Sequence, residues 1–451
     1  MIKNIKKKKL TILFTSFPDF SGNSRALYKY MIKKYNKQMN LIWVVETQSA
    51  FNALSEKGIK CIFKESEEFC HAIDKADLLF DTHGQFSNLD LKNKIYVNLW
   101  HGIPIKKIGY WLDKKDLTEM DIVFLNNVSN KTDLLTTPSQ FSSSLLSVAF
   151  NIKIEKVLTL GMPRLDDFSS DDLTSKFEKI IKTKKQRYKK IIIYLPTFRQ
   201  GCGRYNDGTI SNNNILNLND YDETILLKYL KGNDYLMLVK HHPSEETEIF
   251  KTKSGNLVYF NDSDLGKYDM SLNELLKCTD MLITDYSSVF IEYLALSKPI
   301  IFLDTDISIF ERNRGLILKD KDLWFPGPCV SNIKTFVLEA QKLLQSDSYF
   351  KERRDKLKTL FLENSNNNCK KLCEHLFEKN NFSNKSLSIL DSKSESERGF
   401  SNNEKMDLEE QNLKLDRDIE ELNKKLDNIY NSKAYYIYDR LKKVVKIFNK
   451  K

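Results

Sequence analysis

The chain has 451 residues, enough for two or more domains and a tail, and its 41% hydrophobic and 11% aromatic content is ordinary for a globular core. No apolar run approaches the roughly 18 to 20 residues that span a bilayer, so we expect membrane contact to be peripheral. The formal net charge of +10 gathers at the two ends, which suits an anionic membrane surface. Because basic residues do not alternate with stacking aromatics as in a nucleic-acid module, we expect no nucleic-acid partner.

The seven cysteines are scattered along the chain and form no CxxC pair. Their spacing does not fit a zinc site, so we expect reduced thiols and no bound metal. The lysine-rich N-terminus leads only into a short apolar strand, without the features of a signal peptide. These observations predict a cytoplasmic protein.

Short apolar runs alternate with helical patterns in the first part of the chain, as in Ser24–Tyr35. This alternation predicts parallel strands joined by crossover helices. The strands we predict are Leu10–Ser16, Leu41–Glu46, Lys60–Phe63, Leu78–Asp81, Ile95–Trp100 and Asp121–Asn126, and Val157–Gly161 ends the first half of the chain. Ser170–Lys190 is polar and lysine-rich, which favours a helix and a linker.

A second alternating series begins at Lys190. Its predicted strands are Ile191–Leu195, Tyr235–Lys240, Leu257–Phe260, Met281–Thr284 and Pro299–Leu303, and its predicted helices are Leu272–Cys278, Ser288–Leu296 and the Ile333–Phe361 stretch. Two doubly wound halves of similar size indicate a central cleft, with ligands at the carboxyl ends of the strands. We therefore predict an α/β protein with two Rossmann-like domains, at residues 1–180 and 187–380.

The character of the sequence changes after about residue 380. Residues 381–403 are rich in Ser and Asn and are predicted to be a flexible linker. Residues 404–451 are predicted to form a helical tail, in which a short coiled-coil seam supports a homo-oligomer and a basic aromatic segment from Ala434 binds anionic lipid. The seam also fits a helix that packs back on the body of the protein.

The segment NLWHGIPIKKIG places a histidine where a predicted strand gives way to a glycine turn. His101 follows Trp100 and precedes Gly102, which permits close backbone approach, and Pro104 fixes the direction of exit. An imidazole at the carboxyl edge of a strand suits proton transfer near neutral pH. A buried histidine bonded to backbone is the alternative.

Two further segments place cationic and hydroxyl side chains at strand ends. In GMPRLDDF the guanidinium of Arg164 suits phosphate oxygens, unless it pairs with Asp166 or Asp167 at the surface. In YLPTFR a strand ends at Pro196 and presents Thr197 and Arg199 to the cleft.

The last two segments belong to the second half. In LVKHHP, Lys240, His241 and His242 close an apolar strand; adjacent side chains point oppositely, and we place His242 toward the ligand. In LITDYSSVFIEYLALSKPIIF a strand ends at Asp285, a helix begins at Ser287 or Ser288, and Glu292 lies one turn in. Hydroxyls and free N–H groups at a helix start form an anion site, although a plain helix cap explains one serine by itself.

Together these segments predict a cleft lined by histidine, arginine, lysine and hydroxyl donors, with a diphosphate as the natural ligand. The chain has no Walker loop and no GxGxxG motif. We therefore expect the diphosphate to be held by side chains and helix dipoles, without a cofactor and without an obligatory catalytic metal.

In this order, SFPDFSGNSRALYKYM, LWHGIPIKKIG, GMPRLDDF, YLPTFR, KHHP and TDYSSVFIEYLALSKPIIF resemble the CDP-glycerol glycerophosphotransferase family of teichoic-acid and related capsule synthesis. The resemblance runs from about Phe14 to Leu318. It implies a GT-B-like fold that works as a peripheral protein at the cytoplasmic face of the cell membrane. It also implies transfer of polyol phosphate from CDP-glycerol or CDP-ribitol to a hydroxyl of a lipid-linked saccharide or polymer acceptor, with release of CMP.

The resemblance also assigns roles. His101 would be the general base, and His242, Arg164 and the serine-capped helix would stabilise phosphate charge. The residues implied in substrate binding are Trp100, Gly102, Ile103, Pro104, Arg164, Pro196, Thr197, Arg199, Lys240, His241, Asp285, Ser287, Ser288 and Glu292. Three positions depart from the usual family pattern (Ile103, Lys240 and Glu292), which leaves glycerol against ribitol open.

Two other functions remain compatible with the sequence. One is a GT-B nucleotide-sugar glycosyltransferase of surface polysaccharide synthesis, since the same cleft would hold a sugar diphosphate. The other is a non-catalytic scaffold that organises capsule assembly through its coiled coil and basic tail.

Overall fold

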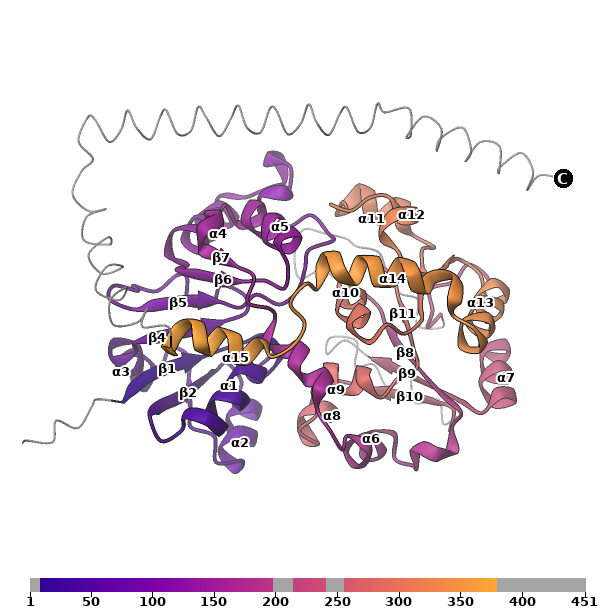
Figure 1. Ribbon diagram of the computed structural model, residues 1–451, viewed down its shortest axis with the longest axis horizontal. Coiled ribbons are helices and arrows are strands. Elements are labelled where there is room, and N and C mark those ends of the chain that lie inside the picture. The colour runs from indigo at the N-terminus through magenta and orange to yellow at the C-terminus, as the bar shows by residue number, and fades with distance from the viewer. Residues whose placement is uncertain (1–8, 198–213, 241–254, 379–451) are drawn as a thin grey trace, which may run out of the picture. The chain divides into compact units, whose positions relative to one another are not determined.

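The structure is a computed structural model that describes residues 9–197, 214–240 and 255–378 (Figure 1). Two sheets organise these residues, and every strand pair within them is parallel. We call the part built on the first sheet the N-terminal lobe and the part built on the second sheet the C-terminal lobe. The predicted linker, coiled coil and basic tail helix lie outside the described residues, as do Arg199, His241 and His242.

The N-terminal lobe contains a seven-stranded sheet in the order β3-β2-β1-β4-β5-β6-β7. Its strands are β1 (Leu10–Phe14), β2 (Met39–Val45), β3 (Cys61–Phe63), β4 (Leu78–Asp81), β5 (Ile95–Asn98), β6 (Leu134–Thr136) and β7 (Val157–Leu158). Its helices are α1 (Gly22–Tyr35), α2 (Gln48–Glu56), α3 (Glu67–Lys75), α4 (Glu119–Lys131) and α5 (Gln140–Phe150), followed by the 3₁₀ segment η4 (Pro163–Ser169). This order places the carboxyl ends of β1, β4 and β5 side by side.

The C-terminal lobe contains a six-stranded sheet in the order β10-β9-β8-β11-β12-β13. Its strands are β8 (Lys190–Leu195), β9 (Tyr235–Lys240), β10 (Leu257–Phe260), β11 (Met281–Thr284), β12 (Ile300–Leu303) and β13 (Cys329–Val330). The helices from residue 174 onward are α6 (Thr174–Ile181), α7 (Glu223–Asn233), α8 (Asp262–Lys267), α9 (Leu272–Lys277), α10 (Val289–Tyr293), α11 (Ile307–Asn313), α12 (Lys321–Trp324), α13 (Ile333–Gln345), α14 (Ser348–Phe361) and α15 (Asn368–Cys373).

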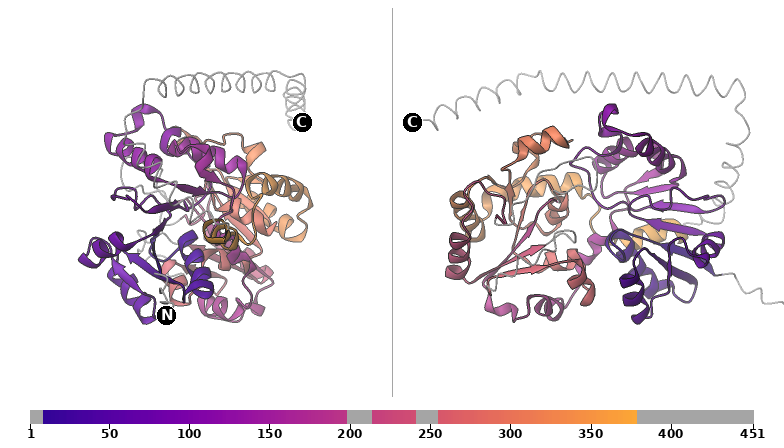
Figure 2. Two further views of the ribbon diagram at one scale, coloured as in Figure 1. Left: turned by 60° about the vertical axis from the view of Figure 1, so that its left-hand side comes forward. Right: turned by 180° about the vertical axis from the view of Figure 1, so that it is seen from behind.

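Helices cover both faces of each sheet (Figure 2). In the second sheet, Ile191 and Ile193 pack in one hydrophobic cluster with α9, α10 and α14, while Ile192 and Tyr194 pack in another with α7 and α13. Side chains of successive strand residues point to opposite faces, so an apolar run such as KIIIYL is what a sheet buried on both faces requires. Both lobes are therefore doubly wound, and the predicted GT-B-like fold class is confirmed.

Two helices pack on a different lobe from the one that their place in the chain suggests. Helix α6 precedes β8, yet Phe177 and Ile180 belong to the hydrophobic cluster of the C-terminal lobe. Helix α15 follows α14 and packs on α1 and η4 of the N-terminal lobe (Figure 1). Asp166 of η4 accepts hydrogen bonds from the backbone N–H groups of Asn368 and Cys369, both 2.8 Å, which fixes the start of α15.

One predicted strand is wrong. Asp121–Asn126 lies inside α4, which begins with a reciprocal cap between Thr118 and Asp121. The Asp121 carboxylate accepts from the Thr118 N–H at 2.9 Å, and the Thr118 hydroxyl accepts from the Asp121 N–H at 3.4 Å. Ile122 and Val123 of this helix are exposed, so their apolar character reflects no buried strand. The strand at this place in the fold is β6, which begins at Leu134.

The predicted Ile333–Phe361 stretch is two helices, α13 and α14, separated at Ser346 and Asp347. Among the helices that the structure describes, none combines the length and the apolar character needed to cross a membrane.

Candidate functional site

The loop that carries His101 follows β5 and is held by a buried asparagine of α1. The side-chain amide of Asn23 donates to the carbonyl oxygens of Leu99, at 3.0 Å, and of Trp100, at 2.7 Å. Its Oδ1 atom accepts from the backbone N–H of Arg164 at 3.1 Å. Asn23 is fully buried and therefore joins the loop at His101 to the segment that carries Arg164. Asn23 lies in the segment SFPDFSGNSRALYKYM, whose sequence did not indicate this role.

His101 is half-buried and has a defined tautomer. Its Nδ1 atom lies 2.9 Å from the carbonyl oxygen of Thr82. Because a carbonyl oxygen only accepts, Nδ1 carries the proton in the neutral ring and Nε2 carries the lone pair. Burial lowers the pKa of His101 from 6.5 to about 4, and the nearby charge of Arg164 lowers it further against the opposing hydrogen bond to Thr82. The imidazole is therefore neutral at pH 7, in the form that accepts a proton.

A second histidine, which sequence analysis did not single out, lies against His101. The ring centroids of His83 and His101 are 3.9 Å apart, and the ring planes differ by 8°. His83 Nδ1 lies 2.8 Å from the Thr82 hydroxyl, so one residue contacts both rings. Burial lowers the pKa of His83 to about 2. The signal for it was present, since Asp81-Thr82-His83-Gly84 repeats the strand, histidine, glycine order of the segment at His101.

Asp81 holds the turn that carries His83. Its carboxylate accepts hydrogen bonds from the backbone N–H groups of Gly84, at 3.2 Å, and Phe86, at 2.9 Å, and from the Tyr96 hydroxyl at 2.8 Å. Burial raises the pKa of Asp81 to about 6, although these hydrogen bonds oppose the shift. These hydrogen bonds hold the turn against β4 and β5. They also fix the Thr82 carbonyl oxygen, which accepts the hydrogen bond from His101 Nδ1.

Arg164 bridges the two lobes. Its Nη2 atom donates to the carbonyl oxygen of His101 at 2.6 Å and forms an ion pair with the buried Glu292 of α10. The second carboxylate oxygen of Glu292 accepts from the side-chain amide of Asn273 at 3.0 Å. The sequence left Asp166 and Asp167 open as partners of Arg164. Neither pairs with it, because Asp166 binds α15 and Asp167 faces Arg25.

The turn at His101 touches the turn at Ser287 and Ser288 of the C-terminal lobe, which we call the serine turn. A Cβ atom on Gly102 would lie 3.1 Å from the Ser288 hydroxyl oxygen and 3.7 Å from Arg164 Nη2. A side chain at this position would crowd the Ser288 hydroxyl, so glycine lets the two turns approach closely. His101, Gly102, Arg164, Ser288 and Glu292 are therefore brought together, although they come from both halves of the sequence.

The turn at Ser287 and Ser288, Ile103 and Trp100 were expected to contact the ligand, and they make the following contacts within the protein. Helix α10 has only five residues, and the Ser288 side chain makes no capping hydrogen bond. Ser287 Oγ accepts from the Val289 N–H at 3.5 Å. Ile103 is buried in the hydrophobic core of the C-terminal lobe, so its side chain supports the loop by packing. Trp100 lies on His101 and Phe150, with ring centroids 4.1 Å and 4.3 Å apart.

Asp285 fixes the end of the neighbouring strand β8. Its Oδ1 atom accepts from the backbone N–H of Thr197 at 2.8 Å and from the Thr197 hydroxyl at 2.6 Å. Thr197 is buried, and Pro196 before it is half-buried. Lys240 at the end of β9 pairs with Asp262, with Nζ and Oδ2 2.9 Å apart. These contacts give Asp285 and Lys240 structural partners at the carboxyl edge of the second sheet.

Two acidic residues that were not predicted as site residues follow β12. Asp304 pairs with Lys321 at 2.5 Å, and Asp306 accepts from the Tyr286 hydroxyl at 3.0 Å. Within residues 9–197, 214–240 and 255–378, no group of three or more histidine, cysteine or acidic side chains has the arrangement of a metal site. Both carboxylates are engaged in fastening the loop after β12.

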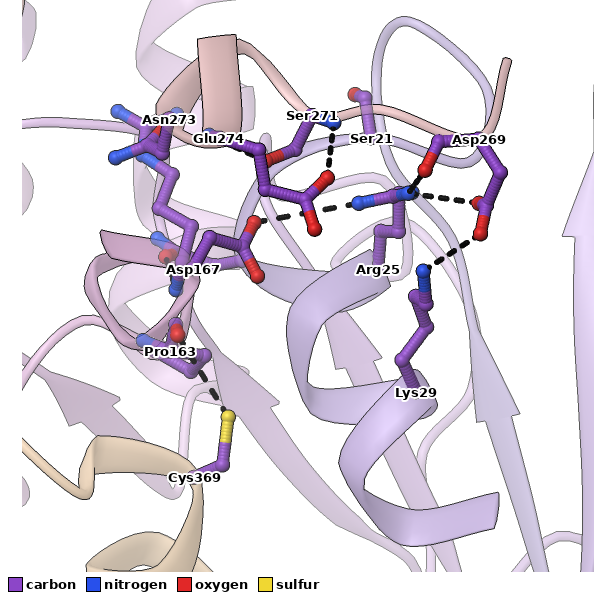
Figure 3. Close-up of polar contacts among 12 residues, drawn as sticks. Ser21, Arg25, Lys29, Pro163, Asp167, Asp269, Ser271, Asn273, Glu274 and Cys369 are labelled. Atoms are coloured by element: carbon purple, nitrogen blue, oxygen red, sulfur yellow. Dashed lines mark hydrogen bonds and ion pairs between the residues drawn. The ribbon is translucent and has the colours of Figure 1, made fainter. Parts of the chain in front are cut away.

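A second polar contact joins the lobes at α1 (Figure 3). Arg25 and Lys29, one turn apart, both reach Asp269, with nitrogen to carboxylate oxygen distances of 2.8 Å in each case. The Nη1 atom of Arg25 lies 4.0 Å from Asp167, and Lys176 donates to the backbone carbonyl of Asp269 at 2.8 Å. Burial raises the pKa of Asp269, but Lys29 and Arg25 outweigh it and lower that pKa to about 2.

Two doubly wound lobes that meet at a histidine turn and a serine turn define the GT-B-like class of transferase fold. The chain belongs to the CDP-glycerol:poly(glycerophosphate) glycerophosphotransferase family, whose model matches residues 1–378. The resemblance drawn from the sequence motifs is thereby confirmed.

Relatives of this chain act in teichoic acid synthesis. The chain is 27% identical over 371 residues to a teichoic acid poly(glycerol phosphate) polymerase of Bacillus subtilis (strain 168), covering 77% of this chain and 46% of the polymerase. It is 28% identical over 327 residues to a teichoic acid glycerol-phosphate primase of the same strain, covering 69% of this chain and 77% of the primase. The chain thus spans about half of the polymerase and most of the primase.

A solved structure of the wall teichoic acid polymerase TagF has the same fold. The TM-score is 0.66 at 22% sequence identity, covering 86% of this chain and 90% of that structure. At this level of identity the likeness shows the fold alone.

Proposed function

We propose that the protein transfers glycerol phosphate or ribitol phosphate from a CDP-polyol to a hydroxyl of a lipid-linked saccharide or polymer acceptor, with release of CMP. The polymer is a teichoic acid or a related capsular polymer. Family membership and the polyol-phosphate relatives support the donor class. The observation that carries the proposal is the neutral His101 imidazole, held beside Arg164 at the meeting of the two lobes.

His101 acts as the general base in this proposal. Its Nε2 lone pair accepts the proton of the acceptor hydroxyl as the hydroxyl oxygen forms a bond to the phosphorus that carries the polyol. The bond from that phosphorus to the bridging oxygen breaks, and CMP leaves with the bonding electrons. The diphosphate of the bound donor adds negative charge beside the ring, which raises the proton affinity of Nε2 when the proton is transferred.

The donor lies against the C-terminal lobe in this proposal, near the Ser287 and Ser288 hydroxyls. Arg164 contributes positive charge at the phosphates while Glu292 fixes its guanidinium. Trp100, Gly102 and Pro104 shape the turn around the reacting oxygen, and Asp285 positions Thr197 at the end of β8. His242, His241 and Arg199 lie outside the described residues, and we retain the roles that the family resemblance implies for them.

The identity of the donor that releases its nucleotide distinguishes this function from its alternatives. Purified protein is incubated with CDP-glycerol, CDP-ribitol or a UDP-sugar and a lipid-linked saccharide acceptor, and nucleotide release is measured. Acceptor-dependent CMP release supports the proposal, whereas UDP release supports a nucleotide-sugar glycosyltransferase. His101→Gln should abolish turnover, and His71→Gln on the exposed face of α3 is the matched control. A capsule scaffold would show no release with any donor.

We also propose that the protein works at the cytoplasmic face of the cell membrane, bound to an anionic surface through its basic tail. The lysines and arginine of residues 433–451 support this placement, and the coiled-coil seam before them supports a homo-oligomer. Deleting residues 434–451 should weaken sedimentation with anionic vesicles and spare transfer to a soluble acceptor. Unchanged sedimentation would overturn the role of the tail.

A further inference from the structure

Phe17 presents a large apolar ring to solvent at the carboxyl end of β1. Its side chain is 64% exposed, whereas Phe20, three residues later, packs edge-on against the buried Trp43 with ring centroids 4.8 Å apart. The loop therefore divides its two aromatic residues, one directed into the core and one outward. The exposed face of this ring is therefore available to contact a ligand.

The loop around Phe17 is fixed by its own hydrogen bonds. The hydroxyls of Ser16 and Ser21 both donate to the Pro18 carbonyl, at 2.7 Å and 2.6 Å. The Asp19 carboxylate accepts from the Thr47 hydroxyl, at 2.8 Å, and from the backbone N–H of Glu46, at 3.1 Å. The ring is thus held outward by a preorganised loop, and little entropy is lost when a ligand binds to it.

The ring of Phe17 also borders the reacting centre. It meets the ring of His83 edge to face, with centroids 5.8 Å apart, and His83 lies flat on His101. The three residues follow β1, β4 and β5, which are adjacent strands. An acceptor whose hydroxyl hydrogen-bonds to His101 Nε2 therefore extends past His83 toward Phe17 if it follows the N-terminal lobe.

The charge near Phe17 favours a neutral ligand over a phosphodiester. Asp19 carries a carboxylate two residues away in the same loop, and Glu46 follows the adjacent strand β2, where Lys64 pairs with it at 2.6 Å. Lys64 offsets the charge of Glu46, whereas Asp19 accepts hydrogen bonds from the neutral Thr47 hydroxyl and the Glu46 N–H, so a glycerol phosphate chain would bring negative charge toward the Asp19 carboxylate. The C–H face of a pyranose ring carries partial positive charge and no net charge, and it complements the electron-rich face of an aromatic ring.

We propose that Phe17, backed by His83, is a subsite for the neutral sugar ring at the reacting end of the acceptor. This inference rests on the proposed function, because the position of the reacting hydroxyl at His101 defines which substrate reaches Phe17. It assigns the acceptor a saccharide end in preference to a glycerol phosphate end.

The test compares Phe17→Ala with Phe17→Tyr, which keeps the ring, and with Tyr349→Ala, which removes an exposed aromatic residue from α14. Transfer from the CDP-polyol is measured with a sugar-ended acceptor, with a glycerol phosphate oligomer and with water. We expect Phe17→Ala to raise KM for the sugar-ended acceptor roughly 2- to 12-fold. KM for the oligomer, KM for the donor and donor hydrolysis should stay unchanged, as should all values for Phe17→Tyr and Tyr349→Ala.

Three results would overturn the subsite: an unchanged KM for the sugar-ended acceptor, an equal rise for the oligomer, or an equal rise in Tyr349→Ala. A binding measurement separates the subsite from the proposed reaction. Saturation-transfer NMR with a panel of methyl hexopyranosides should show transfer from wild-type protein and Phe17→Tyr, and loss of it in Phe17→Ala. Equal transfer to Phe17→Ala overturns the subsite. Absence of nucleotide release from any CDP-polyol by the wild type counts against the proposed function instead.

Discussion

The ring of His83 lies flat on the ring of His101, with centroids 3.9 Å apart, and Thr82 contacts both rings through its hydroxyl and its carbonyl oxygen. His83 thus covers one face of the imidazole that we propose as the general base. It acts as a positioning residue, because it limits the rotation of His101 and keeps water from one side of the ring. Its neutral form also adds no charge that would compete with proton transfer to His101.

His83→Ala should lower kcat about 10- to 100-fold, since a misplaced base loses much of the benefit of general base catalysis. KM for the CDP-polyol should change little. Removal of His83 also exposes His101 to water, so the pKa of His101 should rise from about 4 toward 6.5. Because His101 must be neutral to accept a proton, the acid limb of the kcat profile should move to higher pH. A loss of kcat without this movement would indicate a merely structural role.

The same two histidines should make stability depend on pH. Their folded-state pKa values, about 4 for His101 and about 2 for His83, lie below the usual 6.5, so the unfolded chain binds more protons below pH 6.5. Their contribution is complete above pH 6.5 and is lost as pH falls toward the folded-state values. Asp81 opposes this trend, because its pKa of about 6 lies above the usual 3.8 and its contribution is lost as pH rises through 6.

Urea unfolding at pH 7 and pH 5 tests this linkage. His83→Gln should reduce the loss of unfolding free energy between these two pH values by up to about 2 kcal/mol. His71→Gln, at an exposed position of α3, should leave the loss as it is in the wild type. An equal pH dependence of wild type and His83→Gln would contradict the buried neutral state of His83.

Much of the fold was predictable because apolar periodicity reports burial. Strands such as Tyr235–Lys240 and Met281–Thr284 were predicted with their observed bounds, since a parallel strand covered on both faces is a continuous apolar run. Asp121–Asn126 failed for a physical reason. Ile122 and Val123 are β-branched but exposed, and the cap at Thr118 outweighs their strand preference.

The site was predictable in part. His101, Arg164, Ser288 and Glu292 were recognised from their motifs, and the structure brings them together. The contacts that hold them depend on distances that a sequence does not display. Asn23 binds a carbonyl oxygen 76 residues away, and nothing in its helix indicates which side chain turns toward the loop. The packing of α15 on the N-terminal lobe could not be predicted for the same reason, since its hydrogen bond to Asp166 joins residues 202 positions apart.

Asn23 offers a sharp test of the loop at His101. Asn23→Ala would leave the Leu99 and Trp100 carbonyl oxygens and the Arg164 N–H without their buried partner. Each unsatisfied buried group costs about 1–3 kcal/mol, although relaxation and water recover part of it, so we expect a loss of about 2–4 kcal/mol in unfolding free energy. The residual folded protein should also lose kcat. Asn52→Ala, at an exposed asparagine of α2, is the matched control and should change neither quantity.

The ion pair between Arg164 and Glu292 joins the two lobes, and a double-mutant cycle measures how strongly. Glu292→Gln leaves a guanidinium without its counter-charge in a site where both side chains are largely buried, so it should destabilise the protein by about 3 kcal/mol. Arg164→Met should destabilise it as well. The double variant should lose less than the two single variants together, with a coupling energy of about 1–3 kcal/mol. Unfolding free energies in urea give all four corners of the cycle. Exact additivity would mean that the pair contributes nothing to holding His101 against the C-terminal lobe. The contact at Asp269 and the backbone hydrogen bonds that join Ile105 and Lys107 to Ile317 and Gly315 would then hold the lobes together.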